Sequence, residues 1–238
     1  MSFFNNNNYS GQPSTPVTTN LIIINVLFLL ADFVMERKGI DLSMYLGLHY
    51  YDSDKYSIFQ AVTYMFMHHD FYHLFCNMFS LYMFGRLLEM VWGPQRFLIY
   101  YLVCGVGAGI VQQLAWRFGI VSTWISQIQL QDAEFTYGQL VQEGGRLLNQ
   151  LVTVGASGSV FGILLAFGMM FPNARIFLLF PPMPLKAKWL VIGYGIFELS
   201  AGVVGTTGDN VAHFAHLGGM LFGFILIMMW KHDRRMNF

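Results

Sequence analysis

A serine set among small residues is the group in this sequence best suited to chemistry. Ser157 stands in Gly155-Ala156-Ser157-Gly158, at the start of a hydrophobic segment that runs to Phe171. The first backbone N–H groups of a helix lack intrahelical acceptors, so a serine placed there lies beside a ready-made anion site. A nucleophile that attacks a carbonyl group needs this arrangement. Small residues also let membrane helices pack closely, and the motif taken alone favours packing.

Three other polar residues, His73, Asn77 and His216, also fall within hydrophobic stretches. Polar groups inside a membrane cost free energy and usually face the interior of a helix bundle or a wet cavity, so a functional role is the default interpretation. An interhelical hydrogen bond is the alternative for Asn77. His213, one turn before His216, is expected to be a histidine at the rim.

Glycines favour His216 as the partner of the serine. Gly219 and Gly223 follow it at helical spacing, and Gly158 and Gly162 form a matching set after the serine. Two helices that present small residues to each other can approach closely. The imidazole is therefore expected within hydrogen-bond reach of the serine hydroxyl, where it could accept the proton.

The composition predicts which elements position these groups. Hydrophobic residues make up 55% of the 238 residues and charged residues 11%, and the hydrophobic residues come in blocks, which is typical of an all-α, polytopic membrane bundle. The formal net charge of zero gives no indication of nucleic-acid binding. The two cysteines form no metal-ligand cluster with the histidines.

Six transmembrane helices are expected, and they divide the chain into three regions. The expected spans are 21–34, 73–92, 96–116, 157–171, 188–204 and 211–230. We expect a disordered cytoplasmic tail at 1–19, a six-helix membrane domain at 20–231 and a basic cytoplasmic tail at 232–238. Residues 117–152 form a long polar connection with an amphipathic piece near its end.

The distribution of basic residues predicts that both termini are cytoplasmic. Eight of the 13 Lys and Arg residues then fall on the inside. Ser157 and His216 each lie 14 residues from the cytoplasmic end of their spans. That is about 21 Å along a helix, in a hydrocarbon core of about 30 Å. The two side chains, with His73 and Asn77, are expected at one depth near the outer surface.

The sequence resembles the rhomboids, a family of intramembrane serine proteases. The motifs that carry the resemblance are His73-x-x-x-Asn77, Gly85-Arg86-x-x-Glu89 with Gly93, Gly155-Ala156-Ser157-Gly158, and Ala215-His216-x-x-Gly219.

The resemblance implies a role for each site residue. Ser157 matches the family's nucleophile and His216 its general base. His73 and Asn77 match residues on the oxyanion side, and Phe161 matches an aromatic residue that packs against the catalytic ring. No acidic residue is clearly placed to orient the base, although Glu198 and Asp209 are nearby in sequence, so a serine–histidine dyad is the simpler expectation.

The resulting prediction is an intramembrane serine endopeptidase that cuts single-span membrane proteins near the outer end of their transmembrane segment. Its expected partners are transmembrane-segment substrates and the lipid bilayer, with no cofactor, metal or nucleic acid. A prokaryotic cytoplasmic membrane is the expected location. An inactive rhomboid-like protein that binds transmembrane segments, as a chaperone does, is the alternative. A transporter is a third option, but the sequence has neither an intramembrane charge pattern nor a two-fold repeat.

Overall fold

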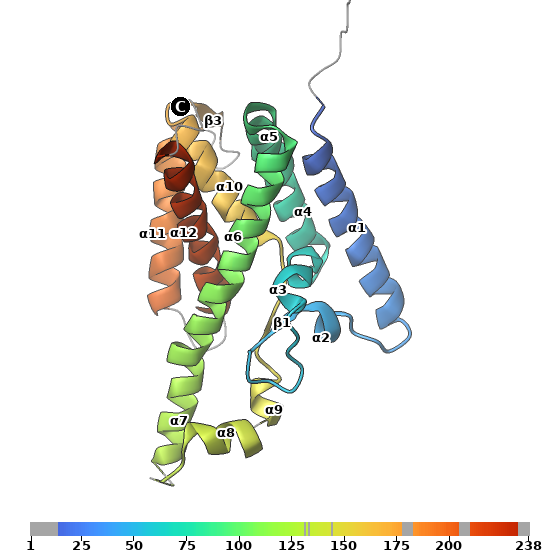
Figure 1. Ribbon diagram of the computed structural model, residues 1–238, viewed down its shortest axis with the longest axis vertical. Helices are drawn as coiled ribbons and strands as arrows, with labels where there is room; N and C mark the ends of the chain where they lie inside the picture. Colours follow the sequence, from blue (N-terminus) through green and yellow to red (C-terminus); the bar gives the residue numbers. More distant parts are fainter. Residues whose placement is uncertain are drawn as a thin grey trace, which may run out of the picture.

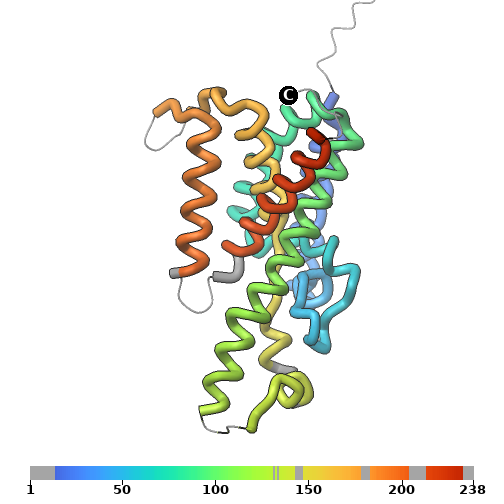
Figure 2. The backbone as a smooth tube through the Cα atoms, turned by 60° about the vertical axis from the view of Figure 1, so that its left-hand side comes forward, coloured from blue at the N-terminus to red at the C-terminus, as the bar shows by residue number. Residues whose placement is uncertain are grey.

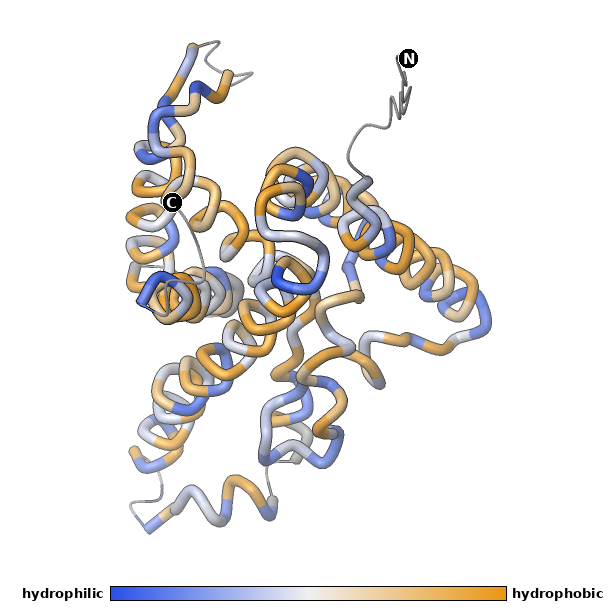
Figure 3. The backbone as a smooth tube through the Cα atoms, turned by 45° about the horizontal axis from the view of Figure 1, so that its top comes forward, coloured by the Kyte–Doolittle hydropathy of each residue, from blue (hydrophilic) through white to orange (hydrophobic). Residues whose placement is uncertain are grey.

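The computed structural model describes residues 14–130, 132, 134–143, 145–177, 183–204 and 210–232. It is a bundle of helices with two very short sheets (Figure 1). Among these residues, four helices are long and apolar enough to cross a membrane: Pro16–Glu36, Phe71–Trp92, Pro94–Gln129 and His213–His232. Figure 3 shows that hydrophobic residues dominate the long helices, whereas hydrophilic residues gather mainly at helix ends and in loops. The all-α membrane bundle expected from the composition fits this structure.

The remaining two expected spans correspond to shorter helices. Helix α10 (Ser157–Met170) has 14 residues and α11 (Ala187–Val204) has 18. At 1.5 Å per residue, α10 covers about 21 Å, which is less than the hydrocarbon core. Four rather than six of the described helices therefore combine the length and hydropathy of a full crossing.

Three helices form the part of the bundle that carries the site. Helix α6 (Pro94–Ala115), α10 and α12 (Asn210–His232) pack against one another, and α11 packs on α10 and α12 (Figure 2). The core between the helices contains fully buried aromatic side chains, among them Phe97, Tyr100 and Tyr101 of α6. The site helices are thus held by a continuous hydrophobic core.

The second transmembrane helix of the sequence prediction is one helix with an irregular turn. Helix α4 (Phe71–Ser80) continues through a π-helical turn, Leu81–Gly85, into α5 (Arg86–Trp92). The chain then reverses at Gly93, whose φ of 80° lies in the left-handed region that favours glycine. Pro94 follows as the first residue of α6, where its missing N–H costs no hydrogen bond.

Helix α1 (Pro16–Glu36) is fixed at its first turn by a buried carboxylate. Glu89 of α5 accepts hydrogen bonds from the backbone N–H of Val17, at 2.9 Å, and of Thr18, at 2.8 Å. The Thr18 hydroxyl donates a third, at 2.7 Å. These donors have no acceptor within their own helix, so Glu89 satisfies them and its charge suits the positive end of the helix dipole.

Helix α1 begins at Pro16, earlier in the chain than the sequence analysis predicted. Residues 16–19 belong to the helix rather than to the disordered tail predicted over 1–19, because Glu89 caps the first turn across the bundle. Residues 1–13 lie outside the described residues. At the other end, His232 closes α12, and residues 233–238 also lie outside.

The connection after the third span is more ordered than the sequence indicated. Helix α6 continues through a π-helical segment, Trp116–Val121, into α7 (Ser122–Gln129). It therefore extends well past the other helices, as Figure 2 shows. Helices α8 (Tyr137–Glu143) and α9 (Gly145–Leu148) follow within the stretch expected to be amphipathic.

A second hydrophobic core forms at this end of the molecule. Its buried residues are Tyr50, Trp116, Val121, Leu140, Leu148 and Leu151. They come from the extended helix, from residues 140–151 and from the long first loop, so the 117–152 connection packs on that loop.

Short elements complete the chain. The first loop contains α2 (Ser43–Leu46), α3 (Gln60–Thr63) and a 3₁₀ turn, Tyr64–Phe66. Strand β1 (Leu48–His49) pairs antiparallel with β2 (Val152–Thr153), which ties this loop to the segment before Ser157. Between α10 and α11, β3 (Arg175–Phe177) pairs antiparallel with β4 (Pro184–Lys186).

Candidate active site

The structure brings Ser157 and His216 together. Ser157 is the first residue of α10, and its Oγ lies 2.8 Å from Nε2 of His216 on α12. Both side chains are partly exposed, and the N-terminal turn of α10 leaves backbone N–H groups beside the hydroxyl. A hydroxyl and an imidazole nitrogen at this distance form the contact through which a general base activates a nucleophile.

Backbone contact between two helices sets this distance. A Cβ atom added at Gly219 of α12 would overlap the carbonyl oxygen of Gly158 of α10. A Cβ at Gly162 would overlap the Cys104 sulfur of α6 and lie 3.1 Å from the Gly219 carbonyl oxygen. Gly158 and Gly162, the glycines after Ser157, thus allow both α6 and α12 to pack closely against α10.

Gly223 differs from the sequence-based expectation. A Cβ added there would overlap the Tyr100 hydroxyl of α6, so Gly223 lets α12 approach α6 rather than α10. The two glycines after His216 therefore contact different helices: Gly219 packs on α10 and Gly223 packs on α6. Tyr100 in turn donates a hydrogen bond of 2.8 Å to the Gly162 carbonyl oxygen, which joins the three helices at this level.

An aromatic ring fixes the plane of the imidazole. Phe161, one turn after Ser157, stacks on His216 with ring centroids 4.2 Å apart and an angle of 8° between the planes. This is the position that the resemblance assigned to it. The stacked ring limits rotation of the imidazole and covers one of its faces.

His73 also lies close to the serine. A Cβ added at Gly155 would be 2.9 Å and 3.0 Å from the Cε1 and Nε2 atoms of His73 and 3.6 Å from the Ser157 hydroxyl. Gly155, with φ of 132°, therefore leaves room for the His73 ring close to the nucleophile. His73 itself sits in the first turn of α4, where its backbone N–H donates to the Asp70 carboxylate at 2.8 Å.

Asn77 is buried one turn further along α4. Its Nδ2 donates a hydrogen bond of 3.1 Å to the His73 carbonyl oxygen, so one of its two amide hydrogens is used within its own helix. His68, which is also buried, packs edge-on against His73 with centroids 4.9 Å apart. Burial, followed by the neighbouring His73, lowers the pKa of His68 to about 3, so it adds no positive charge beside the site at neutral pH.

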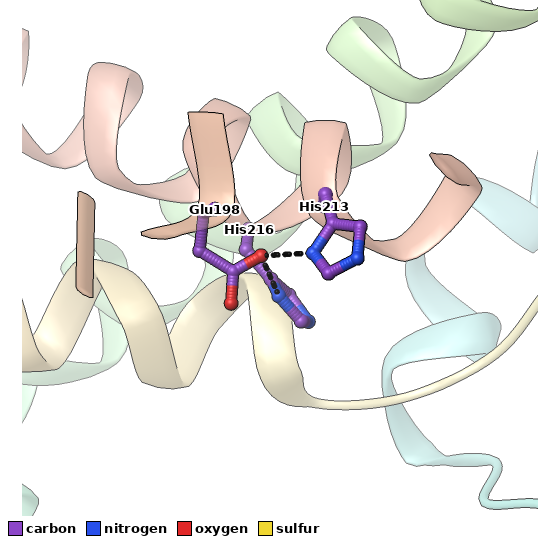
Figure 4. Close-up of side chains that lie close together, drawn as sticks. All are labelled: Glu198, His213 and His216. Carbon is purple, nitrogen blue, oxygen red and sulfur yellow. Dashed lines mark hydrogen bonds and ion pairs between the residues drawn. The ribbon is translucent and has the colours of Figure 1, made fainter. Parts of the chain in front are cut away.

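Sequence reasoning named Glu198 without placing it, and the structure brings this carboxylate into the site. Glu198 of α11 is 4% exposed, and its Oε2 atom lies 2.6 Å from Nδ1 of His213 and 3.0 Å from Nδ1 of His216 (Figure 4). His213 is therefore the partner of a buried acid rather than a rim histidine. The available signal was a lone carboxylate inside a predicted span, which is costly unless it is paired. Asp209 lies outside the described residues.

These three side chains are also the group of donors that could hold a metal ion among the described residues. Two imidazoles and one carboxylate form a donor set typical of zinc. In this structure the Glu198 oxygen lies at hydrogen-bond distance from His213 and at ion-pair distance from His216, so the charges in the cluster can be compensated without a metal ion.

Comparison with known families matches residues 55–232 to the rhomboid domain. The chain belongs to the rhomboid family. The matched range contains all the site residues described above, from His73 to His216. The resemblance drawn from the sequence motifs is thereby confirmed at the level of the family.

Curated relatives include organellar rhomboids. Rhomboid-like protein 11, chloroplastic, of Arabidopsis thaliana is 29% identical over 88% of this chain and 63% of the relative. Rhomboid protein 1, mitochondrial, of Saccharomyces cerevisiae is 27% identical over 66% of this chain and 38% of the relative. The presenilin-associated rhomboid-like protein, mitochondrial, of Bos taurus is 25% identical over 70% and 38%.

The rhomboid chain described here therefore spans 38% to 63% of the length of these relatives. The chloroplast and mitochondrial names do not fit the expectation of a prokaryotic cytoplasmic membrane. The long apolar helices support the coarser statement that the chain is an integral membrane protein.

The contact at Gly219 generates a prediction about the site. Gly219→Ala should force α12 away from α10 and so lengthen the distance between Ser157 and His216, which lowers any activity of this pair by at least about tenfold. Gly193→Ala on α11 is the matched control, because a Cβ there meets no atom within 4 Å. Thermal unfolding and reaction of Ser157 with a fluorophosphonate measure the two effects. Equal reactivity of the two variants would contradict the close-packing account.

Proposed function

We propose that this rhomboid is an intramembrane serine endopeptidase, with Ser157 as nucleophile and His216 as general base. The 2.8 Å contact between Ser157 Oγ and His216 Nε2 carries the proposal. The stacking of Phe161 on the imidazole and the family match support it. An inactive rhomboid-like protein that binds transmembrane segments is the competing function, and it has no need for a serine hydroxyl aimed at an imidazole.

The chemistry is acyl transfer from a peptide to the serine and then to water. His216 Nε2 accepts the hydroxyl proton as Ser157 Oγ forms a bond to the peptide carbonyl carbon. The tetrahedral intermediate collapses when His216 returns the proton to the leaving nitrogen, which breaks the peptide bond. A water molecule activated by the same imidazole then hydrolyses the ester and regenerates the serine.

Groups around Gly155 are suited to hold the oxyanion of the tetrahedral intermediate. The backbone N–H of Ser157 stands at the start of α10, and both the His73 ring and the hydroxyl lie close to Gly155. Asn77, one turn further along α4, has a second amide hydrogen beyond the one bonded to its own helix. We assign His73 and Asn77 to oxyanion stabilisation.

The proposed topology has six spans with both termini in the cytoplasm. In Figure 1 the start of α1 and the end of α12 lie at the same end of the bundle, which supports an even number of crossings. The short α10 and α11 then act as the fourth and fifth spans. Ser157 begins α10 about 21 Å from its other end, near the outer side of the bilayer.

This depth defines the substrate class. A peptide bond in a transmembrane helix is shielded by its hydrogen bonds, so the nucleophile can reach it only where the helix opens. Single-span membrane proteins with small or helix-destabilising residues near the outer end of their span meet this condition.

The first prediction of this proposal concerns the nucleophile. Ser157→Ala should abolish cleavage of a single-span model substrate while the unfolding temperature stays within a few degrees of wild type, because one partly exposed oxygen is lost. Ser159→Ala is the matched control on the same helix, since the Ser159 hydroxyl instead donates to the Tyr101 carbonyl oxygen at 2.8 Å. Cleavage by the Ser157→Ala variant at the wild-type rate would rule out this site.

The second prediction concerns the substrate. Replacing a Gly pair by Leu near the outer end of the model span should slow cleavage by about tenfold or more, because the helix opens less easily. Mass spectrometry of the products from reconstituted vesicles gives both the rate and the cut position. A cut in the cytoplasmic half, or equal rates for both substrates, would show that the proposed depth is wrong.

A further inference from the structure

Glu198 is a buried carboxylate whose environment the serine–histidine pair does not explain. Its side chain is 5% exposed, and its ion-pair contacts among the described residues are with two imidazoles of α12, His213 and His216. A buried carboxylate is costly unless donors or positive charges compensate it. Figure 4 shows the two rings beside one oxygen of this carboxylate, and they are the groups that compensate it.

The carboxylate of Glu198 favours one of the two neutral tautomers of His216. An ionised carboxylate only accepts hydrogen bonds, so a ring nitrogen at 3.0 Å from its oxygen is favoured as the N–H of the neutral imidazole. Nδ1 of His216 is buried, and among the described residues it makes this ion-pair contact with Glu198 and no hydrogen bond. The carboxylate therefore acts on Nδ1 chiefly through its charge at short range.

The tautomer of His216 decides whether its other ring nitrogen, Nε2, can accept a proton. With the proton on Nδ1, the lone pair of the neutral imidazole is on Nε2, which faces Ser157 Oγ at 2.8 Å. This is the tautomer that can accept the serine proton. Once the proton is transferred, the imidazolium lies against the carboxylate, which stabilises the charge that develops in the transition state.

His213 keeps the carboxylate in this place. Its Nδ1 lies 2.6 Å from the same oxygen of Glu198, at the short distance typical of a charge-assisted hydrogen bond. His213 and His216 are three residues apart on α12, so both rings reach one carboxylate on α11. His213 therefore ties α11 to α12 beside the base.

We propose that Glu198 is a positioning residue, which holds His216 with its proton on Nδ1 and its lone pair toward Ser157, and that His213 holds Glu198. The inference rests on the proposed protease function and extends the serine–histidine pair to a chain of four side chains. Glu198 contacts no substrate in this scheme and acts only through His216.

The test measures steady-state cleavage of the single-span model substrate by the full chain in detergent or vesicles. Glu198→Gln should lower kcat by about 10²- to 10⁴-fold, because a neutral amide lacks the charge that favours the proton on Nδ1 and stabilises the imidazolium. KM should stay within about twofold, since the residue does not touch substrate. Glu198→Asp should recover part of kcat. Ser200→Ala, which changes an exposed residue of the same helix, is the matched control.

The pattern of kcat and KM separates positioning from a merely structural role. A change that only loosened the packing of α11 on α12 would lower the unfolding temperature or raise KM together with the loss of kcat, and Glu198→Asp would recover nothing. A loss of kcat without recovery in Glu198→Asp, or a kcat within twofold of wild type, would overturn the inference.

A His213 variant, a double variant and a chelator give three further tests of the positioning role. If Glu198→Gln does not fold, His213→Ala takes its place: it should cost about tenfold in kcat, and an unchanged kcat would overturn the inference. If Glu198→Gln folds, the double variant should cost no more than Glu198→Gln alone. Loss of wild-type activity in EDTA with recovery in zinc would make the three side chains metal ligands and also overturn it.

The design keeps this inference apart from the protease proposal. A wild-type protein that neither cleaves the substrate nor reacts with a fluorophosphonate would contradict the proposed function. A wild-type protein that cleaves normally, beside a Glu198→Gln variant that cleaves equally well, would contradict the positioning role alone.

Discussion

Close contact between the backbones of α10 and α12 is the constraint on which the site depends. Gly219 lies against the carbonyl oxygen of Gly158, so any side chain at Gly219 would push the helices apart. In a lipid bilayer, helices associate through packing and hydrogen bonds rather than through exclusion of water, and small residues make such packing possible. Here that packing brings an imidazole to 2.8 Å from a serine hydroxyl. A shift of one ångström would break this contact, and with it the proton transfer.

The surrounding structure supports this contact from several sides. Tyr100 is fully buried and joins α6 to α10 through its hydrogen bond to the Gly162 carbonyl oxygen. Phe161 of α10 stacks on the imidazole of His216. Further away, Glu89 fixes the start of α1 against α5 through three hydrogen bonds. The two buried carboxylates Glu89 and Glu198 are thus compensated by the first turn of α1 and by two histidines, respectively, as the low dielectric of the bilayer requires.

Much of the site could be predicted from the sequence because its information is local. The Gly-x-Ser-Gly pattern, the glycine after His216 and the hydrophobic blocks are all visible as spacing along one helix. The contacts of Glu198 could not be predicted, because they depend on which face of α11 meets α12, and nothing in the spacing of the α11 residues gives that rotation. The start of α1 was predicted too late for the same reason, since its cap comes from a residue 71 positions away. The second core around Trp116 likewise joins segments that are distant in the sequence.

The most direct test of the account is the site at which a fluorophosphonate binds covalently. Mass spectrometry of peptides from the labelled wild-type protein should find the adduct on Ser157. It should find little or none after His216→Ala, because the hydroxyl then lacks its base. An adduct on another residue, or equal labelling of Ser157 without His216, would contradict the claim that these two side chains act as one catalytic unit.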